Sequence, residues 1–147
     1  MATSLTGATQ VDTLILRPGV EQFLGFDFVG APWHVGNERW AGLVRDMLPA
    51  GVGNGGFSIR GVGASLAVVR AFGAGSPDHE QEDLFFASSM RRMGFNVANR
   101  SVAYAFCLEV PCLDVGPPGD HFALHAAWYY TPRHLLHRML DDSLKYI

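Results

Sequence analysis

The stretch that decides the fold is Gly51–Arg60, GVGNGGFSIR, read together with Ser76–Phe86, SPDHEQEDLFF. Glycine is useful where the backbone takes a positive φ or lies close against a ligand, and it is costly elsewhere. So many glycines in one short segment predict a turn whose main chain is closely approached. Shortly afterwards, Glu82 and Asp83 stand near the start of an amphipathic helix, where their side chains point about 100° apart, so at most one can face a common cleft. A bare backbone near a carboxylate suits a site that holds a polar ligand and moves a proton.

Composition places limits on the rest of the chain. Its 147 residues, 48% of them hydrophobic, are enough for one domain with a sizeable core. The net charge of −3 and the lack of a basic run argue against a nucleic-acid-binding surface. The sequence shows no transmembrane segment and no signal peptide. Cys107 and Cys112 are expected to be buried or free thiols, and a disulfide in an oxidising compartment is the alternative.

Upstream of the glycine turn, hydrophobic runs and breakers predict short strands. The expected elements are a loose tail over residues 1–10, a buried strand Val11–Leu16, a helical turn Val20–Leu24, a strand Phe26–Gly30 broken by Ala31-Pro32-Trp33, and a short helix within Trp40–Met47.

Downstream of the turn, helices and strands alternate. We expect a strand Phe57–Arg60, then a helix Val62–Phe72 buried along Val62, Leu66 and Val69. A second helix follows, with Ser76 as N-cap, Pro77 at its first position, Phe86, Met90 and Met93 on its buried face, and Gly94 as C-cap. The remaining expectations are strands within Asn96–Glu109, a loop Pro111–Asp120, an apolar run His121–Tyr130, and a helix Pro132–Asp142 with Leu135, Leu136, Met139 and Leu140 buried. The pattern predicts an α/β fold with a mixed sheet flanked by helices.

Two short motifs are weak. Gly51–Gly56 fits G-x-G-x-x-G, yet no buried strand precedes it, so a dinucleotide fingerprint is rejected. His121 and His125 have the spacing of a zinc motif but lack its glutamate. Asp12 is either a strand-edge carboxylate facing water or a ligand for a metal or a sugar hydroxyl, and the pattern alone favours the first.

Five segments carry a resemblance when taken in order: QVDTLIL, FDFVGAPW, VGNGGFSIR, EQEDLFF and FALHAAW. Together they resemble a family of uncharacterised glycosyltransferase-like domains with a GT-A-type fold, over residues 10–128. The resemblance implies a partial GT-A-like domain over residues 11–147, after a flexible tail over residues 1–10.

The resemblance also implies roles for individual residues. Asp12 and His125 would bind Mn²⁺ or Mg²⁺, and Asp83, with Glu82 as second choice, would be the catalytic base. The sugar site would be lined by Asn54, Gly55, Gly56 and Phe57, with Trp33, Trp128 and Tyr129 stacking on sugar rings. The implied partners are a nucleotide-sugar donor and a glycan or small hydroxyl acceptor.

This sequence also departs from the GT-A pattern. Gln10-Val11-Asp12 stands where the family has Asp-x-Asp, and the eleven residues before Asp12 are too few for a nucleotide-binding crossover unit. Two functions are therefore expected: an inverting, metal-assisted glycosyltransferase, or a non-catalytic carbohydrate- or partner-binding remnant. An apolar face left open by the missing half would favour a homo-oligomer. The compartment would be the cytoplasm for a complete chain, with the Golgi as the alternative for a fragment.

Overall fold

The computed structural model describes residues 4–33, 51–73 and 81–146, which form a mixed α/β structure. The elements are, in chain order, β1 Leu5–Thr9, β2 Thr13–Ile15, the 3-10 helix η1 Val20–Phe23, β3 Phe28–Pro32, β4 Val52–Gly61, α2 Val62–Phe72, α3 Glu82–Arg92, α4 Arg100–Phe106, β5 Cys107–Leu108, β6 Ala123–His125, the 3-10 helix η2 Ala127–Tyr129, α5 Arg133–Ser143 and the 3-10 helix η3 Leu144–Tyr146.

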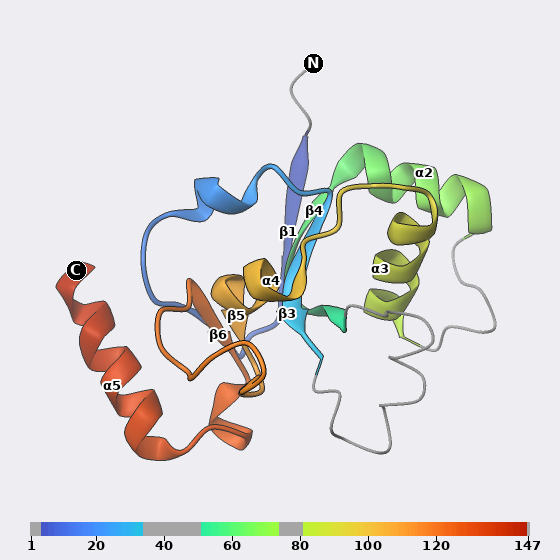
Figure 1. Ribbon diagram of the computed structural model, residues 1–147. Coiled ribbons are helices and arrows are strands. Elements are labelled where there is room, and N and C mark those ends of the chain that lie inside the picture. The colour runs from blue at the N-terminus through green and yellow to red at the C-terminus, as the bar shows by residue number, and fades with distance from the viewer. Residues whose placement is uncertain (1–3, 34–50, 74–80, 147) are drawn as a thin grey trace.

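Two small sheets organise the described ranges. The first has the order β1-β4-β3 and is antiparallel throughout. The second has the order β2-β6-β5, with β6 antiparallel to β2 and parallel to β5. Figure 1 shows the strands in the middle of the molecule, α2 and α3 to one side, and α5 at the opposite side. The predicted α/β class is confirmed, and the second sheet is mixed.

Three apolar clusters hold these elements together. One joins the first sheet to α2 and α3 through Phe28, Ala64, Val68, Leu84 and Met90. Another packs that sheet against η1 and α4 through Phe23, Phe57, Phe106 and Phe122. A third joins the second sheet to α4 and α5 through Leu108, Leu124, Leu136 and Met139. Cys107 lies in the second cluster and Cys112 in the third, and both are buried free thiols, as predicted.

The main correction concerns the glycine-rich stretch. It is not a turn followed by a short strand, because Val52–Gly61 forms one continuous strand. This strand, β4, lies in the centre of the first sheet and pairs with β1 and with β3. Hydrogen bonds to two neighbours outweigh the weak strand preference of glycine.

The N-terminal part also differs from expectation. Residues 5–9 are not a loose tail, because they pair with β4 as β1. The strand expected over Val11–Leu16 is only Thr13–Ile15, and it lies at a sheet edge with Leu14 and Ile15 exposed. The helical turn is confirmed as η1. The next strand begins at Phe28 and continues through Pro32, which an edge strand tolerates because the missing N–H needs no partner there.

The strand prediction for Asn96–Glu109 is wrong over most of its length. Arg100–Phe106 is a helix, and only Cys107–Leu108 is a strand. The helix begins where the Asn99 side chain accepts a hydrogen bond from the Val102 N–H. Apolar residues are buried on more than one side of this helix, so their spacing in the sequence is similar to the alternation expected of a strand.

For the remaining helices, the sequence predicted the position along the chain more accurately than the residues that are buried. The bounds of α2 are confirmed, but Ala64 and Val68 are its buried residues and Leu66 is exposed. The helix α3 is described from Glu82, with Gln81 as N-cap, and Gly94 follows it with φ 79° as expected of a C-cap glycine. Side chains expected to be buried but found exposed are Met93 after α3 and Leu140 in α5. The expectations for Trp40–Met47, Ser76 and Pro77 lie outside the described residues.

None of the helices within the described ranges is long and apolar enough to cross a membrane.

Candidate functional site

A bulge in β4 places the candidate site. Gly30 of β3 pairs with Ser58, while its neighbour Ala31 pairs with Asn54, so Gly55–Phe57 fall between the two pairs. Bulges of this kind re-aim side chains and backbone groups, and they are frequent beside active sites. A Cβ atom at Gly30 would collide with the Asn54 carbonyl group, which shows how closely the two strands approach here. Two groups of polar side chains meet the bulge.

Asp83, in the first turn of α3, is the centre of the first group. Its carboxylate accepts hydrogen bonds from the Gly55 N–H (3.1 Å) and from the Leu84 N–H (2.8 Å). Burial raises the pKa of Asp83 above its ordinary value, against the opposing effect of the two N–H groups and of Arg60. A Cβ atom at Gly55 would lie 2.5 Å from the Asp83 Cβ, so the glycine is what lets the carboxylate reach the strand.

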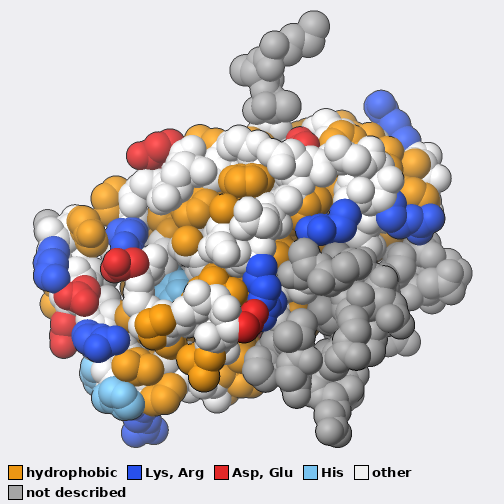
Figure 2. Space-filling view, viewed as in Figure 1, with side chains coloured by type: hydrophobic (Ala, Val, Ile, Leu, Met, Phe, Trp, Pro, Cys, Tyr) orange, Lys and Arg blue, Asp and Glu red, His pale blue; other side chains and the backbone are white. Residues whose placement is uncertain are grey.

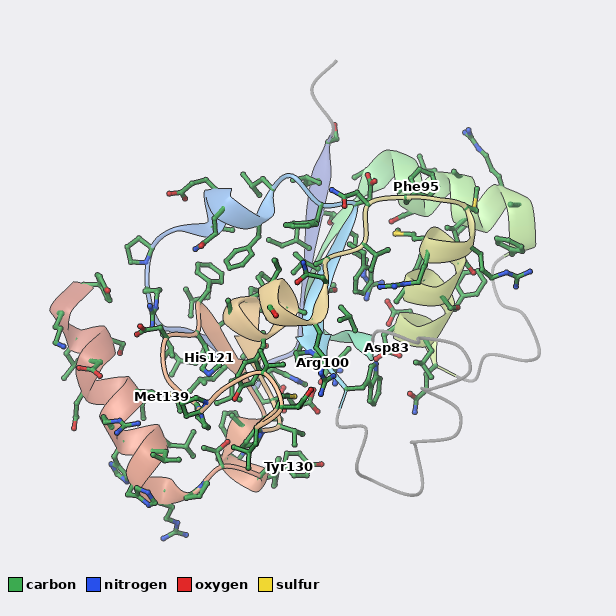
Figure 3. All side chains as sticks on the ribbon, viewed as in Figure 1. Asp83, Phe95, Arg100, His121, Tyr130 and Met139 are labelled. Carbon is green, nitrogen blue, oxygen red and sulfur yellow. The ribbon has the colours of Figure 1, made fainter. Side chains whose placement is uncertain are left out.

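Arg60 of β4 supports the same group from the interior. It is 5% exposed, and its guanidinium lies 5.2 Å from the Phe28 ring centre and 5.1 Å from that of Phe86. It is paired with Glu82 and donates to the Ser58 hydroxyl at 3.0 Å. Glu82 is therefore the largely exposed partner of Arg60, whereas Asp83 is the carboxylate held against the glycine backbone. Figure 3 shows Asp83 at the end of α3 that faces the centre of the molecule.

His125, at the end of β6, is the centre of the second group. Its Nε2 lies 3.3 Å from Asp12 Oδ1 and 3.0 Å from Gln10 Oε1. The antiparallel pairing of Thr13 with His125, and the Ala126 N–H bond to the Asp12 carbonyl (3.2 Å), bring these distant segments together. A Cβ atom at Gly56 would overlap the imidazole ring. The structure thus brings Asp12 and His125 together at Gly56.

Glu109, which sequence reasoning did not single out, faces the other side of the imidazole. Its Oε2 lies 3.5 Å from His125 Nδ1 and accepts a hydrogen bond from the Asn54 amide. Asn54 Oδ1 in turn accepts from the Gly56 N–H at 3.0 Å. The buried Asn54 side chain, expected to line a sugar site, therefore uses both ends of its amide within the chain.

The two carboxylates outweigh the burial of His125. Burial by itself lowers the pKa of His125. The hydrogen bond and charge of Glu109, together with the charge of Asp12, raise it by a larger amount, so the net shift is upward. The imidazolium form is therefore favoured by its surroundings in the absence of a metal ion, and a cation bound at Nε2 would replace the proton there.

Asp12 and His125 have the separation expected of two ligands of one cation. Mn²⁺, Mg²⁺ and similar ions bind oxygen and nitrogen at about 2.0–2.2 Å, so neighbouring ligand atoms lie about 3 Å apart. Asp12 Oδ1 is also buried without a hydrogen-bond partner in the described structure. Glu109 faces the opposite ring nitrogen and cannot join the same ion. Within the described ranges no three His, Cys, Asp or Glu residues converge for a metal, so Gln10 would be the third protein ligand.

The aromatic candidates lie in different surroundings. Phe57 is a core residue whose ring stacks on Phe106 at 4.8 Å. Trp33 is half-buried beside the α2–α3 cluster, and its backbone N–H donates to the Gly51 carbonyl at 2.6 Å. Trp128 and Tyr129 of η2, and Tyr130 just after it, are exposed a few residues beyond His125, and Figure 2 shows hydrophobic side chains at the lower edge of the view where Figure 3 places Tyr130.

His121 is not part of this site. Its Nδ1 donates to the Tyr104 carbonyl at 2.6 Å, and its Nε2 accepts from the Gly119 N–H at 3.1 Å. Burial lowers its pKa below the ordinary value, so the ring is held neutral. With both nitrogens used, His121 is a structural histidine.

A family model described as "Protein of unknown function (DUF5672)" matches residues 8–123. The chain belongs to the DUF5672 family. The matched range includes Asp12, the β4 bulge, Asp83 and Glu109, and it ends two residues before His125. No curated protein and no solved structure matches the chain.

The DUF5672 chain also has an apolar groove of about 520 Å³ between β1, β2 and η1. Exposed Ile15, Val20 and Leu24 line it, and among the described residues of its lining Arg17 is the one charged side chain. The groove lacks the acid–base groups that gather at the β4 bulge, so the bulge is the better candidate for chemistry.

Proposed function

We propose that this DUF5672 domain transfers a sugar from a nucleotide-sugar to a hydroxyl group of a glycan or small acceptor, with inversion and with a divalent ion. One observation carries the proposal: Asp83 and the Asp12–His125 pair meet the same stretch of side-chain-free backbone, Gly55–Gly56. A proton acceptor and a cation-binding pair on one glycine segment are the two functions that such a transfer needs.

Asp83 is the group that accepts the proton. A transferase of this kind removes the proton of the acceptor hydroxyl as the new glycosidic bond forms, and a positioned base contributes about 10²–10⁴-fold to such a step. Burial raises the pKa of Asp83, which makes its carboxylate a stronger base than one in water. The Gly55 and Leu84 N–H groups hold it in one orientation.

The charge of the site supports a cation requirement. Asp12, Glu82, Asp83 and Glu109 surround the bulge, opposed by Arg60 and by His125 when protonated. A nucleotide diphosphate would be repelled by this excess of carboxylates. A Mn²⁺ or Mg²⁺ ion bound by Asp12 and His125 would supply the positive charge that the departing diphosphate needs.

The exposed aromatic side chains on η2 supply a surface for sugar rings. Trp128 is 46% exposed and Tyr129 is 74% exposed, a few residues beyond His125. Aromatic rings with a polar tip pack well against ligands that have both apolar and polar faces, as sugars do.

The first experiment is a thermal-shift series with UDP, GDP and their sugars, each with and without manganese. A ligand at 100 times its Kd stabilises a fold by about 2.7 kcal/mol, which raises Tm by several degrees. We expect a manganese-dependent rise with one nucleotide, lost in Asp12→Ala and kept in Glu21→Ala, which removes an exposed carboxylate on η1. The absence of any manganese-dependent rise in the wild type would contradict the proposed donor site.

A second function, carbohydrate binding without transfer, is favoured by the exposed aromatic segment on η2. It predicts stabilisation by free oligosaccharides without manganese, unchanged in Asp12→Ala and lost in Trp128→Ala. That pattern, with no release of nucleoside diphosphate from any donor, would replace the transferase proposal.

A further inference from the structure

We propose that the apolar groove between β1, β2 and η1 binds a single amphipathic molecule, with its alkyl chain along the groove and an anionic head group, such as a phosphate, at Arg17. The inference is independent of the sugar transfer proposed for the β4 bulge, because Asp12, Asp83 and His125 do not belong to the described lining of the groove. It assigns this second site a ligand rather than a reaction.

The groove has a buried floor and exposed walls. Its floor is formed by Phe57, Ile59 and Phe122, which belong to the apolar cluster that packs the first sheet against η1 and α4. Its walls carry Ile15 of β2, 58% exposed, and Leu24 beside η1, 43% exposed. Covering such side chains with an alkyl chain removes apolar surface from water. The volume of about 520 Å³ lies in the range of small-molecule sites, about 300–1,000 Å³.

Arg17 determines the charge of the ligand that the groove favours. It is the one charged side chain in the described lining, so no carboxylate of these residues opposes an anion there. Its Nη2 donates to Asp120 at 3.1 Å, but the Asp120 side chain is 97% exposed, and exposed pairs of this kind are weak. Its Nε has no hydrogen-bond partner among the described residues. The guanidinium therefore keeps hydrogen-bonding capacity for an anionic oxygen.

A second hollow, of about 130 Å³, is also lined by Arg17 and adds positive charge beside it. Arg138 of α5 and Lys145 of η3 line this hollow, together with the carboxylates of Asp120 and Asp142. Asp142 is paired with Lys145 and Asp120 with Arg17, whereas no ion pair within the described ranges includes Arg138. Three cations and two carboxylates leave a net positive charge where the head group would lie. Each part of the ligand then meets a surface of its own kind.

The size of the groove favours a small molecule over a second copy of the chain. Twelve described residues line it. A stable protein interface of standard size uses about 20–30 residues on each side. An alkyl chain is covered by far fewer residues, and the single positive charge of the groove matches a single anionic head.

The experiment is isothermal titration calorimetry of the whole chain with decyl phosphate, below the concentration at which it forms micelles. We expect decyl phosphate to bind, 1-decanol to bind more weakly, and inorganic phosphate to give no signal at the same concentrations. Each buried CH₂ group strengthens binding by about fourfold. Octyl phosphate should therefore bind more weakly than decyl phosphate by about 10-fold or more.

Substitutions locate the site. Ile15→Glu and Leu24→Glu each place a charge in the groove and should abolish binding of decyl phosphate. Leu14→Glu is the matched control, because Leu14 is the neighbouring residue on β2, is 44% exposed and does not belong to the described lining. Arg17→Met keeps an apolar side chain but loses the charge. It should weaken binding of decyl phosphate by about 10–100-fold and leave the affinity for 1-decanol unchanged.

Four results would overturn the inference. Equal affinities for inorganic and decyl phosphate would show that the groove contributes nothing, and an unchanged affinity in Arg17→Met would remove the head-group site. Sedimentation with vesicles of phosphatidylcholine and phosphatidic acid, without binding of decyl phosphate, would show a membrane surface as the partner. A wild-type dimer that Ile15→Glu converts to a monomer, again without binding of decyl phosphate, would show a second copy as the occupant.

Discussion

The imidazole of His125 occupies the space next to Gly56 that any side chain at Gly56 would need. The glycine is therefore set by a close contact between two strands rather than by a turn, and the contact gives a direct test of the site.

Gly56→Ala should displace the His125 ring and lose the manganese-dependent thermal shift. Forcing an extra methyl group into a packed contact costs about 1–3 kcal/mol of unfolding free energy. Chemical denaturation checks the cost, and Gly63→Ala in α2, where a Cβ atom meets nothing within 4 Å, is the matched control. The control should gain about 0.5–1 kcal/mol from helix propensity. Equal effects of the two substitutions would show that His125 does not depend on Gly56.

Asp83→Asn should lower the transfer rate by about 10²–10⁴-fold while leaving donor binding intact. In the wild type the rate should fall as the pH drops through the pKa of Asp83, which burial places above the ordinary 3.8. Glu82→Gln, which changes the exposed neighbour on α3, should keep that pH profile. If the fall in rate at low pH disappeared in Glu82→Gln and remained in Asp83→Asn, Glu82 rather than Asp83 would be the base.

Arg60→Met should raise the pKa of Asp83 further, because the charge of Arg60 lowers that pKa in the wild type. The loss of unfolding free energy should be moderate, about 1–2 kcal/mol, since Glu82 is largely exposed and stays solvated when its partner is removed. Titration of the Asp83 carboxyl by NMR measures the shift, and Arg60→Lys, which keeps the charge, should stay nearer the wild type. A lower pKa of Asp83 in Arg60→Met would contradict the effect of the Arg60 charge on that carboxylate.

His121 should make the fold less stable in acid. Its pKa is lowered in the folded state, so the unfolded chain binds the proton more readily, and stability is lost as the pH falls below the ordinary 6.5. His121→Gln should remove that loss, which denaturation at pH 7 and pH 5 would show.

His125 should contribute with the opposite sign, because its pKa is raised in the folded state. Its stabilisation is present below 6.5 and disappears as the pH rises through the folded pKa. The difference in unfolding free energy between wild type and His125→Gln should therefore shrink with increasing pH. If both variants changed stability in the same direction with pH, one of the two environments would be misassigned.

The sequence predicted those parts of the fold that depend on local pattern. The limits of α2 and the glycine cap after α3 follow from spacing and from one residue's backbone freedom. The role of Gly51–Arg60 as a central strand could not be predicted, because it depends on pairing with β1 and β3, both distant in sequence. Asn99 as a helix cap was equally hidden within an apparent strand alternation.

The candidate site, like the fold, was predictable only where local pattern was enough. Gly55 and Asp83 were linked by chemistry alone, since a bare backbone and a nearby carboxylate suggest a site. Glu109 and Arg60 were missed because each gains its meaning from a partner on another strand or helix. An arginine in the apolar segment FSIRGV was the one local signal for Arg60.

The chain's two cysteines, Cys107 and Cys112, are both interior and belong to different apolar clusters. Burial raises the pKa of each thiol, so neither reacts readily while the structure is closed. A thiol reagent therefore modifies this protein only when a cluster opens, and mass spectrometry of the labelled peptide tells which one. The unmodified sequence thus contains two built-in reporters of local unfolding, one for the aromatic packing beneath the first sheet and one for the packing of α5.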